Sequence, residues 1–192
     1  MKTKNKKIKT FSGKFVDPLA MRVEDIYIVD IAHALSNECR YAGHCPEFFS
    51  VAQHSMNVAF TAWKLTGDIE TTFAALLHDA SEAYLKDMPS PVKWRLRQYV
   101  AAEKRLLKVI ARTFNIKNVI KGIIKQADAH ELQFEQWGLR YVNPNAQDVV
   151  HKFLNLYDYL QKLRGQDASP MVRRDVTEIL RRFAFSKIPL SS

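Results

Sequence analysis

The sequence predicts an all-α protein folded as a single compact helical bundle. Only six glycines and seven prolines interrupt its 192 residues, apolar side chains recur at helical spacing, and we find no credible set of strands. Hydrophobic residues make up 47% and charged residues 26% of the chain, which is typical of a globular domain with a substantial core.

Breaks in the helical pattern separate the expected elements. Residues 1–10 are expected to form a basic flexible tail and residues 11–192 the single domain. Helices are expected at about 30–35, at 51–65 with Ser50 as N-cap, and at 69–85, 91–114, 118–141, 145–163 and 169–183. Met88-Pro-Ser-Pro91 ends the third helix, because proline cannot continue its hydrogen bonding.

Charge and cysteine content narrow the class of protein. The net charge is +9, but five lysines within the first nine residues leave +4 for the body, which suits a small anionic substrate at least as well as a nucleic acid. No apolar run approaches the roughly 20 residues that span a bilayer, and no secretory signal is found. We therefore expect a cytoplasmic protein with no membrane partner, in which Cys39 and Cys45 remain thiols outside any common zinc pattern.

The most informative motif is His78-Asp79, which follows a run of apolar helix formers. Glu82 comes four residues after His78 and three after Asp79, so a helix over 69–85 places all three side chains on one face. In isolation, such a pair is more often a hydrogen-bonded core histidine beside a solvent-facing carboxylate.

Asp128 favours a metal site instead. Apolar residues four positions before and after it predict that it faces the core, where a carboxylate requires a cation or strong donors. His54, on the inward face of its own helix, supplies a second imidazole. The set His54, His78, Asp79 and Asp128 suits one divalent ion such as Mn²⁺, Co²⁺, Ni²⁺, Fe²⁺ or Mg²⁺, with positions left for water and a substrate oxygen.

Several short motifs accompany these residues. They are Arg40-Tyr41, Gln53-His54-Ser55, His78-Asp-Ala-Ser-Glu82, Asp87, Pro89-Ser-Pro-Val-Lys93 and Asp128. In this order they resemble the HD-domain metal-dependent phosphohydrolase superfamily, and more closely its bacterial 5′-deoxynucleotidase-like members. Thr10–Lys14, Asp30–Ser36, Cys39–His44 and Tyr84 further resemble phage- and prophage-associated HD hydrolases, so the resemblance spans roughly residues 10–140.

The resemblance implies an all-helical fold and a role for each residue of the site. Glu82 is expected to position or deprotonate the attacking water, and Asp87 to protonate the leaving 5′-oxygen or hold the sugar hydroxyl. Arg40 is expected to clamp the phosphate, Tyr41 to pack on the sugar or base, and Lys93 to make a weaker phosphate contact. Related proteins favour homodimers, and nothing in the sequence contradicts one.

Departures from the family pattern narrow the expected activity. No histidine lies between Asp79 and Asp128, so one metal ion per chain is expected. Alarmone hydrolases of the superfamily resemble His-Asp-x-x-Glu-Asp, whereas Glu82 is followed by Ala83 in this sequence. Tyr41 replaces the tryptophan typical of the deoxynucleotidases. The main hypothesis is removal of the 5′-phosphate from nucleoside monophosphates, with deoxynucleotides preferred. The alternatives are hydrolysis of a nucleoside triphosphate or alarmone, and non-catalytic binding of a nucleotide or nucleic acid.

Overall fold

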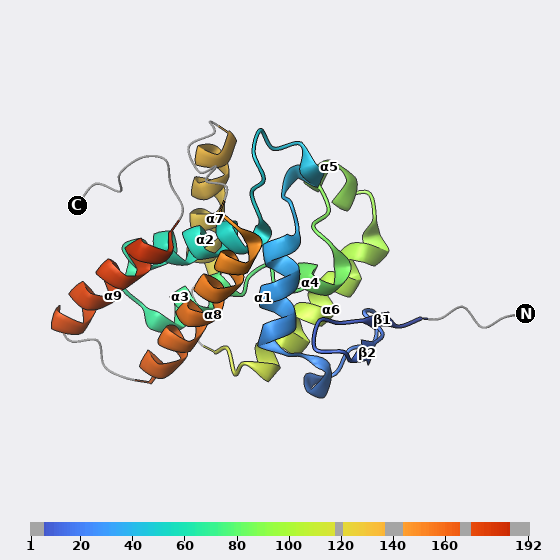
Figure 1. Cartoon of the computed structure of the whole chain (residues 1–192), viewed down its shortest axis with the longest axis horizontal. Helices are drawn as coiled ribbons and strands as arrows, with labels where there is room; N and C mark the ends of the chain where they lie inside the picture. The colour runs from blue at the N-terminus through green and yellow to red at the C-terminus, as the bar shows by residue number, and fades with distance from the viewer. Residues whose placement is uncertain (1–5, 118–120, 137–143, 166–169, 185–192) are drawn as a thin grey trace, which may run out of the picture.

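Figure 1 shows the computed structural model, in which helices surround α2 (Val51–Thr66). The structure describes residues 6–117, 121–136, 144–165 and 170–184. The other elements are β1 (Ile8–Lys9), β2 (Phe15–Val16), η1 (Val23–Asp25), α1 (Ile28–Asn37), η2 (Tyr41–Gly43), α3 (Ile69–Leu76), α4 (Glu82–Leu85), α5 (Ser90–Lys93), α6 (Arg97–Thr113), α7 (Lys121–Gln136), α8 (Ala146–Leu163) and α9 (Pro170–Phe183). The all-α prediction is confirmed.

The central helix α2 begins and ends at local sequence signals. The Ser50 hydroxyl accepts the Gln53 N–H at 3.2 Å, and the Gln53 side chain accepts the Ser50 N–H at 2.9 Å, which forms a capping box. At the other end Gly67 adopts φ +60° and donates its N–H to the Trp63 carbonyl. Every residue of 51–63 is buried, because α1, α3, α7, α8 and α9 all pack against this helix.

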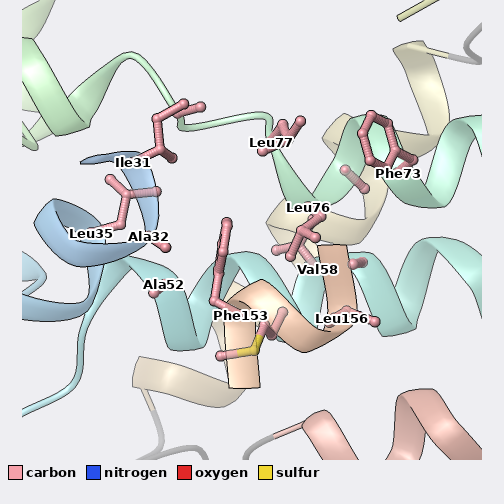
Figure 2. Close-up of a cluster of buried hydrophobic side chains, with 14 of the residues drawn as sticks. Ile31, Ala32, Leu35, Ala52, Val58, Phe73, Leu76, Leu77, Phe153 and Leu156 are labelled. Carbon is pink, nitrogen blue, oxygen red and sulfur yellow. The ribbon is translucent and has the colours of Figure 1, made fainter. Parts of the chain in front are cut away.

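One continuous hydrophobic core holds these helices together. Figure 2 shows its centre, where side chains of α1, α2, α3 and α8 meet around the fully buried Phe153 of α8. The buried cluster extends from Val16 of β2 to Leu180 of α9. Both ends of the described chain therefore contribute to the same core.

A small hairpin departs from the strand-free prediction. Ile8 pairs with Val16 and Lys9 with Phe15 in antiparallel register, so residues expected to belong to the flexible tail form β1. The turn of the hairpin is attached to α1 through Asp30. The Asp30 carboxylate accepts two hydrogen bonds from Ser12, one from the backbone N–H at 2.6 Å and one from the side-chain hydroxyl at 2.9 Å. Strands of two residues are too short to produce an alternating pattern, which explains why the sequence does not reveal them.

Two of the expected helices are interrupted. The helix predicted over 69–85 is divided into α3 and α4, and the one predicted over 91–114 into α5 and α6. Leu96 separates the latter pair, since its φ of −103° and ψ of 74° lie outside the helical region. Helices α7, α8 and α9 agree with prediction where they are described; the expected boundaries at 118, 141 and 169 lie outside the described residues.

None of the helices in the described part of the chain has the length and apolar character needed to cross a membrane.

Candidate metal centre

His54 projects from the buried centre of α2 with both ring nitrogens facing carboxylates. Its side chain is fully buried, and Nδ1 lies 2.6 Å from Oε1 of Glu135 on α7. Nε2 lies 3.1 Å from Oδ1 of Asp128, which lies two turns before Glu135 on the same face of α7. The Glu135 contact with Nδ1 orients the ring so that Nε2 faces Asp128.

His78 is held in the same way, but by backbone. It lies in the turn between α3 and α4, where the helical hydrogen-bond ladder stops, and its Nδ1 donates to the Ala75 carbonyl at 2.8 Å. The prediction that an unbroken helix carries the His-Asp pair is therefore wrong. The break contributes to the site, because the Ala75 carbonyl near the end of α3 accepts the ring N–H and so orients His78.

The Nε2 atoms of His54 and His78 are buried, and neither makes a hydrogen bond with acceptable geometry. Ligand atoms of His54, His78 and Asp128 all lie within 4.8 Å of one another. Asp79 adds an oxygen that is 3.1 Å from His78 Nε2 and 3.8 Å from His54 Nε2. Two ligand atoms each about 2.0 to 2.2 Å from one ion lie at most about 4.4 Å apart, so the spacing of the His54, His78 and Asp128 group is close to what a single divalent cation requires.

The electrostatics of the site indicate a missing positive charge. Burial and Arg40 oppose protonation of His54, but Glu135 and Asp128 outweigh them and raise its pKa to about 9. Burial likewise opposes ionisation of Asp79, yet His78 and His54 hold its pKa below the usual range. The metal-free protein therefore uses imidazolium charge to neutralise the carboxylates.

Asp128 is more accessible than the sequence suggests. Its side chain is 37% exposed, whereas its apolar neighbours predict a core-facing position. Burial raises the pKa of Asp128, but the close approach of His54 and the charges of His78 and His54 outweigh it, so the carboxyl pKa is lowered. Asp128 thus lies at the solvent-accessible edge of the cluster.

Glu82 lies at the start of α4 beside the predicted ligands. Its side chain is almost fully buried, and its Oε2 has no hydrogen-bond partner. Burial, Asp79 and Asp87 raise the pKa of Glu82 to about 10. Asp87 is half-buried, and burial likewise raises the pKa of its carboxyl, against the opposing charge of Arg40. The structure therefore brings both predicted catalytic carboxyls into the electrostatic field of the candidate metal centre.

Arg40 and Tyr41 contact the cluster through Glu135. Arg40 is buried; its Nε donates to Glu135 Oε2 at 3.0 Å, and its Nη1 lies 4.0 Å from Asp79 Oδ2. The Tyr41 hydroxyl donates to the same Glu135 oxygen at 2.7 Å. A phosphate contact by Arg40 would therefore use its terminal Nη groups, and Tyr41 has a hydrogen-bonding role that the sequence does not indicate.

The structure also places the remaining candidates. Lys93 of α5 forms an ion pair with Glu103 of α6, and it lies within electrostatic range of Glu82 and Asp79. Cys39 and Cys45 are free thiols, and neither belongs to the metal-ligand cluster found among the described residues.

Sequence reasoning missed Glu135. A second buried carboxylate of α7, Glu131, lies one turn earlier and accepts the Thr61 hydroxyl at 2.6 Å. The sequence spacing could have identified Glu135, because it follows Asp128 by seven residues and so occupies the same face of α7.

Fold and site together define an all-helical protein with a candidate mononuclear metal centre of two histidines and neighbouring carboxylates. No family model matches the chain. The chain is 40% identical over 129 residues to the uncharacterized protein YfdR of Escherichia coli (strain K12), a match that covers 67% of the chain and 70% of YfdR. An uncharacterized protein of Rhodobacter capsulatus is 36% identical over 121 residues, which cover 60% of the chain and 62% of that relative.

The chain belongs to the same family as YfdR. Neither relative's name states an activity, so the argument for function depends on the site.

Proposed function

We propose that the chain is a metal-dependent phosphohydrolase that removes the 5′-phosphate from nucleoside monophosphates, with deoxynucleotides as the preferred substrates. One observation carries the proposal: two buried imidazoles, each oriented through Nδ1, direct Nε2 atoms without hydrogen-bond partners toward Asp79 and Asp128. Buried polar atoms are rarely left unsatisfied, and a cation explains both at once.

His54, His78, Asp79 and Asp128 would hold the ion. When bound, a divalent cation supplies Lewis-acid polarisation of a phosphoryl group and lowers the pKa of a water molecule. The mixed nitrogen and oxygen ligands are compatible with Mn²⁺, Co²⁺, Ni²⁺, Fe²⁺ or Mg²⁺, and a purely thiolate-binding ion is disfavoured.

The surrounding residues match the needs of phosphate ester cleavage. Glu82 is protonated in the metal-free protein; the added positive charge of a cation favours its ionised form, in which it accepts a proton from the attacking water. Asp87, whose pKa is raised by burial, can hold a proton for the leaving 5′-oxygen. Arg40 offers Nη groups to the phosphate oxygens. A binding protein has no need of the two acidic groups.

A nucleotide panel tests the proposal. The purified chain, loaded separately with each of the five ions, is incubated with nucleoside 5′-mono-, di- and triphosphates and an alarmone, in ribose and deoxyribose forms. Release of inorganic phosphate from 5′-monophosphates is expected. Release of pyrophosphate or triphosphate would support the polyphosphate alternative, and absence of any product with every ion would overturn the enzyme assignment.

Matched variants separate the site from contaminating phosphatases. Asp128→Ala removes a predicted ligand and should abolish phosphate release. Asp158→Ala removes an exposed carboxylate of α8, outside the cluster, and should keep wild-type activity. Equal activity of the two variants would show that the phosphate comes from elsewhere.

A further inference from the structure

The backbone just before Asp87 adopts an unusual conformation. Lys86, at the C-terminal end of α4, has φ 72° and ψ 150°. This combination of left-handed φ with extended ψ is almost confined to glycine, because a Cβ atom crowds the backbone there. A lysine persists in it only where its surroundings hold it, and such residues cluster at functional sites.

Two side chains from distant parts of the sequence hold this turn. Oε1 of Glu38 accepts the Asp87 backbone N–H at 2.8 Å and pairs with the Lys86 ammonium at 3.0 Å. From the opposite direction, the hydroxyl of Tyr99 on α6 donates to the Lys86 carbonyl. The peptide between Lys86 and Asp87 is therefore held at both its N–H and its C=O.

Glu38 is itself rigidly placed. It is 6% exposed, directly follows α1, and its own carbonyl accepts the Val51 N–H at the start of α2 at 3.0 Å. The next residue, Cys39, forms an isolated bridge with Ser50, and Arg40 follows. One short segment thus carries both the guanidinium of the candidate site and the carboxylate that holds the Asp87 turn.

The ion pair with Lys86 does not by itself compensate for the free energy of burying the Glu38 carboxylate. Its ammonium partner, Lys86, has a side chain that is 76% exposed, and exposed ammonium groups contribute little to stability. The buried carboxylate is instead directed at a single backbone N–H, that of Asp87. Asp87 lies within electrostatic range of Arg40, Asp79 and His54, so the turn places Asp87 in the neighbourhood of the candidate metal centre.

We propose that Glu38 is a positioning residue which, together with Tyr99, holds the strained Lys86–Asp87 peptide and so keeps Asp87 in place beside the metal centre. This proposal rests on the phosphohydrolase function proposed above. Glu38 itself touches neither substrate nor ion; it acts through Asp87.

Kinetics of the metal-loaded chain test this role with Glu38→Ala, Asp87→Asn and the double variant. Because a displacement of about 1 Å at a catalytic group costs up to roughly a hundredfold in rate, Glu38→Ala should lower kcat by about tenfold to a hundredfold with unchanged metal content. Glu38→Gln keeps an acceptor for the Asp87 N–H and should recover part of kcat. In the Asp87→Asn background, Glu38→Ala should have no further effect, because the two residues act as one unit.

The control is Glu70→Gln, which breaks the ion pair of Glu70 with Arg164 on the α3–α8 side of the bundle. This variant should lower thermal stability and leave kcat unchanged. If Glu38→Ala behaves like Glu70→Gln, with reduced melting temperature and wild-type kcat in the folded protein, the positioning role is overturned. An equal kcat loss in the wild-type and Asp87→Asn backgrounds overturns it as well.

Amide hydrogen exchange of Asp87 gives a readout that does not depend on activity. The Asp87 N–H should be protected in the wild type and in Tyr99→Phe, and exposed to exchange in Glu38→Ala. Exchange in Glu38→Ala as slow as in the wild type would show that Glu38 does not hold the turn. If the wild type hydrolyses no nucleotide but shows the expected exchange, the phosphohydrolase function and the catalytic part of the proposal both fail, whereas the holding contact stands.

Discussion

Glu135→Gln tests how the metal centre is built. Glu135 is fully buried, and its two oxygens accept three donors: His54 Nδ1 at 2.6 Å, Arg40 Nε at 3.0 Å and the Tyr41 hydroxyl at 2.7 Å. A glutamine has one acceptor oxygen, so its amide N–H₂ must face either His54 or the other two donors. In both orientations the hydrogen bond that orients the His54 ring is weakened, while the volume of the side chain at position 135 stays nearly the same.

The expected loss of metal affinity is about tenfold to a hundredfold, the usual effect of removing a carboxylate that supports a ligating histidine. This corresponds to about 1.4 to 2.7 kcal/mol. The loss should be largest near pH 9. Below that pH a proton on His54, whose pKa is raised to about 9 partly by Glu135, competes with the metal in the wild type. The variant partly escapes this competition, so the difference should narrow toward pH 7.

The assay is competition with a calibrated chelator for Mn²⁺ or Ni²⁺ at pH 7 and pH 9. Glu131→Gln is a matched control, because Glu131 lies one turn earlier on α7, is 1% exposed and accepts the Thr61 hydroxyl rather than a predicted ligand. This control should bind metal like the wild type. Wild-type affinity in Glu135→Gln at pH 9, or an equal loss in Glu131→Gln, would refute the reasoning.

Three further predictions concern protonation and the core. Because the pKa of His54 is raised to about 9, metal binding at pH 7 should release about one proton, and affinity should rise with pH up to about 9; calorimetry in buffers of different ionisation enthalpy measures this, and zero release contradicts it. The pKa of Glu82 is raised from 4.5 to about 10, so the folded metal-free protein holds a proton that the unfolded chain loses above pH 4.5. Glu82→Gln should therefore raise the melting temperature more at pH 8 than at pH 4, and should lower kcat about 10²- to 10⁴-fold with metal retained; an active variant would remove Glu82 from catalysis. Phe153→Ala, in the fully buried centre of Figure 2, should cost about 3 to 5 kcal/mol in urea unfolding, and a cost below about 1 kcal/mol would contradict the observed packing.

The sequence predicts the fold class well where the signals are local. The Ser50 capping box and the left-handed Gly67 are sufficient to delimit α2, and Asn145, where a helix was expected to begin, is the N-cap of α8. The breaks at 77–81 and at Leu96 have no such signal, because neither contains a glycine or a proline. Tertiary contacts override helix propensity there, and at 77–81 the result is a turn that orients His78.

In the candidate site, too, the features with local sequence signals were predicted and those that depend on distant contacts were not. The convergence of His54, His78 and Asp128 was predictable from the motifs and from the inward faces of their helices. The roles of Glu38 and Glu135 were not predicted, because they depend on contacts across 49 and 81 residues of sequence. Glu135 had a weak periodicity signal on α7, whereas Glu38 had none, since its target is a backbone N–H.

Metal stoichiometry tests the central claim most directly. The wild-type chain, Asp128→Ala and Asp158→Ala are dialysed to equilibrium against Mn²⁺ and analysed by plasma mass spectrometry. We expect one ion per chain in the wild type and in Asp158→Ala, and no stoichiometric ion in Asp128→Ala. A wild-type chain without stoichiometric metal, or an Asp128→Ala variant that keeps one ion, would contradict the proposed metal centre.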